Sequence, residues 1–420
     1  MKLANTATLT QPCCRHCRTP LNLVFADLNS TPVSNDFLSA DRLNEAEPFY
    51  PLRALVCRAC RLVQLQDFFV SADLFREDYA YFSSYSTAWL DHAKRYTEAM
   101  TERFALTTAS RVVEIASNDG YLLQYFGEAG VPVLGVEPSR SVAEVAIAER
   151  GVPTTVRFFG RDTAADLLAE GHAADLMVAN NVLAHVPDIN DFVDGFRVLL
   201  KPDGVATFEF PHLLNLIRLN QFDTIYHEHF SYLSLLAAER IFVAAGLRVF
   251  DVERLSTHGG SLRLFVCHAG AARPAGETLA AVRAEEAAAG LDDDAVYMAF
   301  DERVRETKRA LLELLIGLKR AGKTVVGYGA PAKGNTLLNY CGIGADMIDF
   351  TVDRSPHKQG RFLPGTRLPI HAPARIDEVK PDYILILPWN LEQEITTSLA
   401  HVRDWGGRFI LPIPTARIVD

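Results

Sequence analysis

Two closely spaced cysteine pairs near the start of the chain constrain its fold more than any other feature. Cys14 and Cys17 form one C-x2-C pair, and Cys57 and Cys60 form a second pair forty residues later. Four thiolates brought together in this way provide the tetrahedral ligand set of a closed structural zinc site. The separation exceeds the ~15–20 residues of the usual zinc ribbon, so a longer insert must loop out between the pairs. We therefore predict a small zinc-binding domain over residues 1–70.

Other sulfur and nitrogen groups are weaker candidates as ligands. Cys13 is a spare thiol and His16 is an alternative ligand, whereas Cys267 and Cys341 stand alone and are predicted to be core residues. Buried free cysteines are the alternative to a metal centre. Because four protein ligands leave no open coordination position, we expect the zinc to hold structure and to do no chemistry. The second pair falls at the turn of a hairpin predicted over 52–65.

The composition excludes several classes of protein. A chain of 420 residues is too long for one ordinary core, which predicts two or three domains. A net charge of −10 is not typical of a general nucleic-acid binder, although it allows a nucleotide-linked small substrate. No window approaches the ~20 uninterrupted apolar residues of a membrane helix, and the polar N-terminus lacks a signal-peptide pattern. We therefore expect a cytoplasmic protein that binds neither a nucleic-acid polymer nor a membrane, as a monomer or weak homodimer.

Short apolar segments alternate with helical patterns from residue 111 onward. The predicted strands are 112–116, 133–136, 175–179 and 205–210. Strands separated by helices need crossover connections and form a parallel sheet, so we predict a Rossmann-like α/β domain over residues 71–270. Ligands bind outside the carboxyl ends of such strands, where Glu114, Glu137 and Asn180 fall.

The turn after the first of these strands indicates which cofactor the domain binds. It reads Ser-Asn-Asp-Gly and has only Gly120, whereas a loop that holds a pyrophosphate carries several glycines. This departure suits S-adenosylmethionine, whose amino acid end carries both signs of charge; an unrelated α/β enzyme is the alternative. Glu137 closes the second strand, where an acidic side chain usually accepts hydrogen bonds from ribose hydroxyls. The candidate cofactor contacts are Glu114, Ala116, Asn118, Gly120, Glu137 and Asn180.

A second α/β unit follows a helical connector. Helices are predicted over 277–288 and 293–321, within a connector that spans residues 271–322. A strand and a glycine turn then lead into a helix at Lys333, which presents backbone N–H groups, a helix dipole and a full positive charge to an anion. We predict a Rossmann-like domain over 323–420 that holds the diphosphate of a substrate. A purely structural glycine loop is the alternative.

The stretch from Tyr226 to Tyr232 contains the candidate catalytic groups. It reads Tyr-His-Glu-His-Phe-Ser-Tyr, and burying so many polar side chains costs free energy unless each one is paired. Histidine titrates closest to neutral pH, and a neighbouring carboxylate or phenol can tune it. A surface loop with two solvated histidines is the alternative, but the position downstream of the cofactor turn favours a catalytic centre. A hydroxyl-rich segment at 75–86, which includes Tyr79, is either a lid over a polar ligand or a plain helix entry.

The order of these motifs resembles that of the C-methyltransferases that place a methyl branch on nucleotide-linked deoxysugars. The similarity covers nearly the whole chain. It rests on the two C-x2-C pairs, on Glu-Ile-Ala-Ser-Asn-Asp-Gly from Glu114, on Tyr-His-Glu-His-Phe-Ser-Tyr from Tyr226, and on Gly-Tyr-Gly-Ala-Pro-Ala-Lys-Gly-Asn-Thr from Gly327. The resemblance implies an N-terminal zinc-binding domain, a central S-adenosylmethionine domain and a C-terminal Rossmann-like domain that contributes to sugar-nucleotide binding.

The resemblance also implies roles for individual residues. His229 would be the catalytic base with Tyr226 and Glu228 as its neighbours, and Tyr79 would reach the sugar and belong to the catalytic set. The implied substrate is a dTDP-linked 4-keto-deoxysugar, methylated at C-3′, although the sequence leaves C-5′ open. The substrate contacts implied in this way are Tyr79, Asn181, His185, Tyr226, Lys333 and Asn335.

The residue types agree independently with methylation of carbon. A ketone acidifies the adjacent C–H, a base of near-neutral pKa removes that proton, and the enolate carbon attacks the methyl group of the sulfonium. The enolate oxygen needs a hydrogen-bond donor, for which Tyr226, His227 and Tyr79 are candidates. Three alternatives stay open at this point. They are O- or N-methylation of a sugar or small metabolite, a nicotinamide-dependent oxidoreductase that uses the loop at Gly327 with Asp353, and a zinc-containing scaffold without catalysis.

Overall fold

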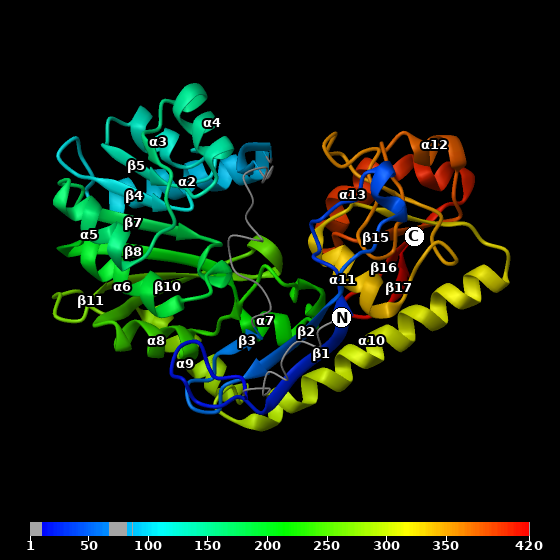
Figure 1. Ribbon diagram of the computed structural model, residues 1–420, viewed down its shortest axis with the longest axis horizontal. Helices are drawn as coiled ribbons and strands as arrows, with labels where there is room; N and C mark the ends of the chain where they lie inside the picture. The colour runs from blue at the N-terminus through cyan, green and yellow to red at the C-terminus, as the bar shows by residue number, and fades with distance from the viewer. Residues whose placement is uncertain (1–10, 67–81, 86, 420) are drawn as a thin grey trace, which may run out of the picture.

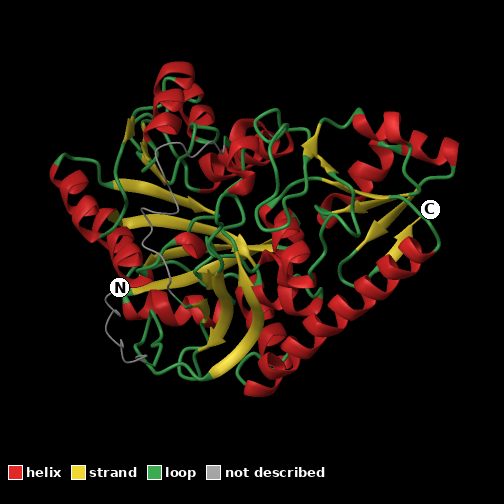
Figure 2. Ribbon diagram, turned by 45° about the vertical axis from the view of Figure 1, so that its right-hand side comes forward, coloured by secondary structure: helices red, strands yellow, loops and turns green. Residues whose placement is uncertain are grey.

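Three β-sheets form the framework of the molecule. The computed structural model describes residues 11–66, 82–85 and 87–419 (Figure 1). A seven-stranded sheet and a six-stranded sheet form the centres of two bodies, and a four-stranded sheet lies between them at the lower edge of the view in Figure 1. Helices pack around both of the larger sheets (Figure 2).

The four-stranded sheet is antiparallel and is built from two distant parts of the chain. Its order is β1-β2-β3-β9, and the register pairs Ala54 with Leu65 and Val63 with Tyr232. The predicted hairpin is confirmed as β2 and β3. The fourth strand comes from the end of the Tyr-His-Glu-His-Phe-Ser-Tyr stretch, so this sheet holds the candidate catalytic residues at its edge. The elements are β1 (Leu23–Thr31), η1 (Ala40–Asn44), β2 (Tyr50–Val56), β3 (Val63–Leu65) and β9 (Ser231–Tyr232).

The seven-stranded sheet contains the predicted parallel strands. Its order is β10-β11-β8-β7-β4-β5-β6, and the strands from β8 to β6 run parallel. All four residues of β4 are buried, as expected for a strand covered on both faces. The carboxyl ends of β4, β5 and β7 therefore meet at one edge. The strands are β4 (Val112–Ile115), β5 (Val133–Val136), β6 (Thr154–Thr155), β7 (Ala174–Asn180), β8 (Leu200–Pro211), β10 (Leu247–Leu255) and β11 (Ser261–His268).

The hairpin of β10 and β11 was not predicted and adds two antiparallel strands to the predicted parallel sheet. β10 pairs antiparallel with β11, and β11 pairs antiparallel with β8. The direction reverses because only a short turn joins the two strands, and so short a connection cannot return the chain to a parallel neighbour. The pairing sets Arg263 opposite Glu209, and their side chains form a buried ion pair at 2.8 Å.

The helices of this body follow the hydrophobic rhythm expected of helices that pack on a sheet. In α6 the apolar residues recur every three or four positions, and Asp188 caps the helix by accepting a hydrogen bond from the backbone N of Asp191 at 3.1 Å. The helices are η2 (Ser83–Tyr85), α2 (Thr87–Arg103), α3 (Leu123–Glu128), α4 (Arg140–Arg150), α5 (Arg161–Ala169), η3 (Leu183–His185), α6 (Ile189–Leu199), α7 (Leu213–Arg218), η4 (Phe222–Thr224), α8 (Leu235–Ala244), η5 (Thr257–Gly259) and α9 (Glu277–Ala288).

A helix of 27 residues, α10 (Asp294–Arg320), connects the two bodies (Figure 1). The helices predicted at 277–288 and 293–321 are thus confirmed as α9 and α10. The inner face of α10 packs on β1, where the rings of Phe25 and Phe300 stack with their centroids 4.4 Å apart. No helix in the described part of the chain is both long and apolar enough to cross a membrane.

The six-stranded sheet forms the C-terminal body. Its order is β14-β13-β12-β15-β16-β17, in which only the last pair is antiparallel. Gly342, with φ of 73°, ends α11 in the left-handed conformation that favours glycine. The elements are β12 (Val325–Tyr328), α11 (Ala332–Cys341), β13 (Thr351–Val352), β14 (Ile370–His371), α12 (Arg375–Val379), β15 (Tyr383–Ile386), η6 (Trp389–Leu391), α13 (Glu392–Ser398), η7 (Ala400–Trp405), β16 (Arg408–Leu411) and β17 (Arg417–Val419).

One buried carboxylate joins α9 to two other elements of the central body. Glu286 is 2% exposed, and its Oε1 accepts hydrogen bonds from His212 Nε2 and from the backbone N of Leu235, both at 2.7 Å. Its Oε2 accepts a hydrogen bond from the backbone N of Leu236 at 2.8 Å. Because the last two donors open α8, the carboxylate also lies at the positive end of that helix dipole.

Replacing this carboxylate should destabilise the fold strongly. Glu286→Ala is expected to lower the free energy of unfolding by about 3–5 kcal/mol, because three buried donors lose their acceptor. Denaturant unfolding followed by circular dichroism measures the change. The matched control is Glu285→Ala, whose partners are the surface residues Arg218 and Arg254 and whose loss should cost no more than about 1 kcal/mol. Equal losses in the two variants would contradict this account.

Candidate active site and metal centre

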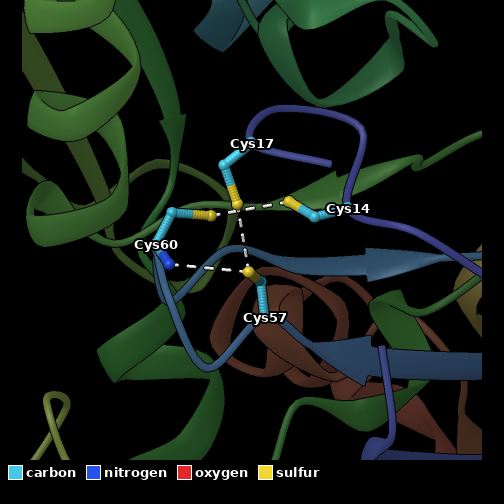
Figure 3. Close-up of side chains that lie close together, drawn as sticks. All are labelled: Cys14, Cys17, Cys57 and Cys60. Carbon is cyan, nitrogen blue, oxygen red and sulfur yellow. Dashed lines mark hydrogen bonds between the residues drawn. The ribbon is translucent and has the colours of Figure 1, made fainter. Parts of the chain in front are cut away.

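The four predicted cysteines lie together beside the turn between β2 and β3 (Figure 3). Their sulfur atoms all lie within 4.8 Å of one another, with Cys14 Sγ 3.5 Å from Cys60 Sγ and Cys17 Sγ 3.4 Å from Cys57 Sγ. A tetrahedral zinc with Zn–S bonds of about 2.3 Å requires sulfur atoms about 3.8 Å apart. The donor set and its spacing therefore fit Zn²⁺.

Both pairs are held by the same kind of tight turn. The backbone N of Arg18 donates to the carbonyl of Cys14 at 3.0 Å, and the backbone N of Arg61 donates to the carbonyl of Cys57 at 2.8 Å. Both arginines have φ of 63°, which closes each turn in the left-handed region. The two turns present their thiols to a common centre.

The weaker ligand candidates are engaged elsewhere. His16 Nδ1 lies 2.7 Å from Asn190 Oδ1, and Cys13 is exposed with its thiol on a backbone carbonyl. Neither residue completes the cluster. Cys267 and Cys341 are buried, which confirms them as core residues.

Arg15 links the cysteine cluster to the candidate catalytic stretch. Its Nη1 donates to the carbonyl of Pro187 and its Nη2 to that of Leu65, both at 2.9 Å, while the guanidinium lies 5.3 Å from the ring centroid of Phe230. The backbone N of Leu65 donates to the carbonyl of Phe230 at 3.0 Å. Phe230, which follows His229, is therefore held both by Arg15 of the first cysteine pair and by Leu65 of β3.

The turn between β4 and α3 has an unusual backbone, with three residues in the left-handed region. Ala116 and Asn118 have φ of 55° and 50°, and such left-handed residues are held in place only by their surroundings. Gly120 has φ of 77°, and a Cβ there would lie 3.1 Å from Val152. The backbone N of Asn118 donates to Glu137 Oε2 at 3.0 Å, which ties the turn to the end of β5.

Buried carboxyl groups surround this turn. Within the described residues, Glu114 Oε2 and Asp119 Oδ1 are buried without a hydrogen-bond partner. Burial raises the pKa of Glu114 well above its ordinary value and also raises the pKa of Glu137. A cationic ligand would satisfy these oxygens and restore the ionised form. S-adenosylmethionine carries a sulfonium and an ammonium group, so the site fits it. Asn180 completes the predicted set at the end of β7.

Tyr226 and His229 form a hydrogen-bonded pair. His229 Nδ1 lies 2.8 Å from the carbonyl of Thr224, and a carbonyl only accepts, so Nδ1 carries the proton. His229 Nε2 then accepts the hydrogen bond of the Tyr226 hydroxyl at 2.8 Å. Burial, helped by the fields of His185 and His258, lowers the pKa of His229 well below 6.5. The imidazole is therefore neutral at pH 7, with one lone pair available.

A second group of side chains surrounds this pair. The ring of His185, on η3, lies 4.6 Å from that of His229, and burial lowers its pKa to about 4. Asn181 follows β7 with φ of 54°, and its Nδ2 lies 3.3 Å from His258 Nε2. His258 itself has φ of 53° in the β10–β11 turn. The structure thus places the predicted residue His185 against His229 and bonds the predicted residue Asn181 to His258.

His227 and Glu228, which lie between Tyr226 and His229 in the sequence, contact the N-terminal region. Glu228 accepts hydrogen bonds from Asn35 Nδ2 at 2.8 and 3.0 Å. Its carboxylate is therefore bonded to Asn35 and not to the imidazole of the neighbouring His229. His227 Nε2 lies 3.2 Å from the carbonyl of Pro51, so its donor is used on β2 and not for an enolate.

The C-terminal candidate residues lie at the start of α11. Lys333 Nζ lies 4.4 Å from the ring centroid of Trp389 and bonds to Asn390 Oδ1, and burial lowers its pKa. Asn335 is buried; its Oδ1 accepts from Asn339 at 3.2 Å, whereas its Nδ2 has no partner within the described residues. Tyr79 lies outside the described residues.

Several residues of the site were not predicted. Asn35, Asp223 and Trp389 lack any local sequence signal, because they reach the site only through contacts between distant segments. His258 did have a local sequence signal, because it is a histidine followed by two glycines between apolar strands. Glu209 also had one, as an acidic residue within an apolar strand.

Loss of a cluster cysteine should remove the metal and destabilise the fold. Cys57→Ser is expected to abolish zinc binding and to lower the free energy of unfolding by more than about 4 kcal/mol, since one tetrahedral ligand is lost. Elemental analysis of the purified protein and thermal unfolding measure the two effects. The control is Cys13→Ser, which should keep both the zinc and the stability. Full zinc content in Cys57→Ser would contradict the assignment.

Glu228 should make stability depend on pH. Burial raises its pKa to about 7 from 4.5, with the bonds from Asn35 opposing the shift. The native state therefore binds more protons than the unfolded state between these values, so stability falls as pH rises through this window. Glu228→Gln is expected to gain up to about 3 kcal/mol at pH 8 and almost nothing at pH 4.5.

Denaturant unfolding at the two pH values tests this. The control is Glu302→Gln on the exposed face of α10, where a hydrogen bond from Arg309 lowers the pKa of the glutamate. This control should show no gain at pH 8. An equal gain at both pH values for Glu228→Gln would show that ionisation of this carboxyl is not the cause.

Three family models match consecutive parts of the chain. They are described as "Putative zinc binding domain" (residues 14–75), "Methyltransferase domain" (residues 89–252) and "C-methyltransferase C-terminal domain" (residues 256–414). Together they span the cysteine cluster, the turn between β4 and α3, and the glycine turn that leads into α11.

Curated relatives include one that is similar over the whole chain. The C-methyltransferase NovU of Streptomyces niveus is 37% identical over 407 residues, which cover 97% of this chain and 96% of the relative. A ubiquinone biosynthesis O-methyltransferase of Bartonella tribocorum is 28% identical over 98 residues, which cover 23% of this chain and 38% of the relative.

Solved structures align with part of the chain. The magnesium protoporphyrin IX methyltransferase of Synechocystis with bound SAH is 15% identical, with a TM-score of 0.34, and the alignment covers 43% of this chain and 82% of that one. From the family models and the full-length relative it follows that this chain belongs to the family of S-adenosylmethionine-dependent C-methyltransferases with an N-terminal zinc-binding region.

Proposed function

We propose that the protein methylates a carbon of a dTDP-linked 4-keto-deoxysugar, at C-3′, through an enolate that His229 generates. The observation that supports this most is the Tyr226–His229 pair. It joins a neutral imidazole, oriented by a backbone carbonyl, to a phenol that can donate a hydrogen bond. A base and a donor on neighbouring atoms are what enolisation of a ketone requires.

The proton transfer follows from the tautomer. When the ketone binds, the Tyr226 hydroxyl turns from His229 Nε2 to the ketone oxygen, and Nε2 takes the proton from the adjacent carbon. The C–H bond breaks, an N–H bond forms, and the electron pair moves onto the oxygen that Tyr226 faces. The carbonyl of Thr224, which accepts from Nδ1–H, stabilises the imidazolium.

S-adenosylmethionine supplies the methyl group and, as a sulfonium, the driving force for its transfer to the enolate carbon. Glu114, Asn118, Gly120 and Asn180 would hold the cofactor, with Ala116 in the same turn and Glu137 at its ribose. The proton left on His229 then passes to solvent. The metal takes no part, because four cysteine ligands leave it no open position.

The substrate would lie between the two bodies. Asn181, His185 and Tyr79 would contact the sugar, and Lys333 at the N-terminus of α11 would hold the diphosphate with the helix dipole. Asn335 Nδ2, buried and without a partner within the described residues, would add a donor. Glu228 would act through Asn35 by holding the catalytic stretch in place.

The rival functions receive less support. The O-methyltransferase relatives match only 98 residues, which cover 23% of this chain and 38% of each relative. For a nicotinamide site Asp353 would have to face a ribose, but its carboxylate accepts hydrogen bonds from the backbone N of Ala330 at 2.7 Å and of Ser355 at 2.8 Å.

Isotope exchange separates the steps of the proposed reaction. In heavy water a dTDP-4-keto-6-deoxysugar should gain deuterium next to the ketone without cofactor, and one methyl group when S-adenosylmethionine is added. His229→Ala is expected to slow both processes by about 10²–10⁴-fold, because the base is gone. Mass spectrometry of the sugar measures both, and calorimetry should show unchanged cofactor binding.

The control variant is His401→Ala, a histidine on the C-terminal body that pairs with Asp377 and should leave both rates unchanged. A methyl group on oxygen or nitrogen, or wild-type exchange in His229→Ala, would overturn the proposed chemistry. Absence of exchange with every keto-sugar offered to the wild type would overturn the substrate class.

A further inference from the structure

We propose that Trp389 is a positioning residue that couples the anion site at Lys333 to the catalytic His229. The coupling passes through Asp223, and proton abstraction becomes fast only when the nucleotide end of the substrate is seated. This inference rests on the proposed function and adds to it a link between two parts of the site. Trp389 opens η6 in the C-terminal body, whereas Asp223 and His229 belong to the segment that follows α7.

The indole of Trp389 contacts a negative group, Asp223, and a positive group, Lys333. Its Nε1 donates a hydrogen bond to Asp223 Oδ2 at 2.7 Å. Its ring lies 4.4 Å from the ammonium of Lys333, which also bonds to Asn390 Oδ1. A diphosphate that binds Lys333 must compete with the indole and with Asn390 for that ammonium. The indole is therefore the group whose contacts change when the anion arrives.

Asp223 is the buried group that responds when the contacts of Trp389 and Lys333 change. It is 0% exposed and lies on η4, which packs against α11. Burial raises the pKa of Asp223 to about 6, and the nearby charge of Lys333 opposes that rise. Because water is excluded there, a change in the electric field of Lys333 or in the hydrogen bond from Trp389 acts on the carboxylate with little screening.

The next residue carries the change to the base. The carbonyl of Thr224 accepts the Nδ1 hydrogen bond of His229 at 2.8 Å and so sets the tautomer and the tilt of the imidazole. Because Asp223 and Thr224 are consecutive residues of one short helix, movement of the carboxylate reorients this carbonyl. The path from the ammonium of Lys333 to His229 thus contains two side chains, of Trp389 and Asp223, and the short stretch of backbone from Asp223 to the carbonyl of Thr224.

A second branch of contacts reaches the opposite wall of the site. Gln221 Nε2 donates to the carbonyl of Gly259 at 2.9 Å. A Cβ on Gly259 would lie 3.3 Å from the ring of Trp389, so the turn that bears His258 packs closely on the indole. His258 in turn lies 3.3 Å from Asn181. Trp389 therefore packs against both segments that bear polar groups of the site.

The test compares two tryptophans of the same body. Trp389→Phe keeps an aromatic ring under Lys333 and removes the hydrogen bond to Asp223. The matched control, Trp405→Phe, removes a hydrogen bond to the carbonyl of Pro381. Trp389→Phe is expected to lower kcat for deuterium exchange into the keto-sugar by about tenfold or more, with KM and the Kd for dTDP changed less than about threefold. Trp405→Phe should change none of them.

A spectroscopic readout does not depend on the substrate. In protein labelled with ¹⁵N-histidine, addition of dTDP should shift the Nδ1–H signal of His229, identified by its loss in His229→Gln. The shift should persist in Trp405→Phe and be absent in Trp389→Phe. Asp223→Asn keeps an oxygen for the indole but removes the negative charge that responds to Lys333, so it should lose most of the shift. This milder variant tests the link if Trp389→Phe unfolds.

The outcomes are distinct. Unchanged kcat and an unchanged dTDP-induced shift in Trp389→Phe overturn the coupling. A raised KM with unchanged kcat would make Trp389 a plain binding residue. Losses that add in the double variant of Trp389→Phe and Asp223→Asn would show that the two residues do not act through one bond. If wild-type protein exchanges no keto-sugar but still shows the dTDP-induced shift, the proposed substrate fails while the coupling stands.

Discussion

The position of the proposed base depends on the clamping of one segment, residues 222–232, by the N-terminal region with its four-stranded sheet and by the C-terminal body. The segment contains the proposed base and its phenol partner but only short elements of its own, η4 and β9. Its conformation is therefore set by hydrogen bonds to other parts of the chain. These bonds are Leu65 N to the carbonyl of Phe230, Asn35 Nδ2 to Glu228, His227 Nε2 to the carbonyl of Pro51, and Trp389 Nε1 to Asp223 Oδ2.

This arrangement explains why a structural metal belongs in the molecule. The region around the cysteine cluster contributes a short sheet of modest core, and sheets of this size gain much from a cross-link. Arg15 lies between two cluster cysteines and contacts both Leu65 and Phe230. A zinc that fixes Arg15 would therefore also help to fix Phe230 and the proposed base beside it, without any chemical role for the ion.

Burial shifts the pKa values of the two halves of the site in opposite directions. At the cofactor turn it raises the pKa of Glu114 and Glu137, which prepares these carboxyls for a cationic ligand. Around the base it lowers the pKa of His185 and His229, which keeps both imidazoles neutral. One physical cause, the loss of water, thus favours a cationic ligand at one end of the site and keeps the imidazoles of the proposed base region neutral at the other.

Local pattern was enough to predict much of this protein. The cysteine pairs, the polar residues at the ends of β4, β5 and β7, and the helices α9 and α10 were predicted because a strand or helix of regular period shows itself in consecutive residues. The Tyr226–His229 pair was also accessible, since the two residues lie only three positions apart in the sequence. The roles implied by family resemblance for Tyr79, Lys333 and Asn335 remain proposals.

The sequence by itself determined the kinds of chemistry present: thiolates for a metal, carboxyls at strand ends, and an imidazole beside a phenol. Only the tertiary structure decided which partners these groups meet. It turned β10 and β11 antiparallel, bonded Glu228 to Asn35 and not to His229, and brought Trp389 to Asp223 across 166 residues of sequence. The physical reason is that side-chain type is local, whereas burial and hydrogen-bond pairing arise only when distant segments pack together.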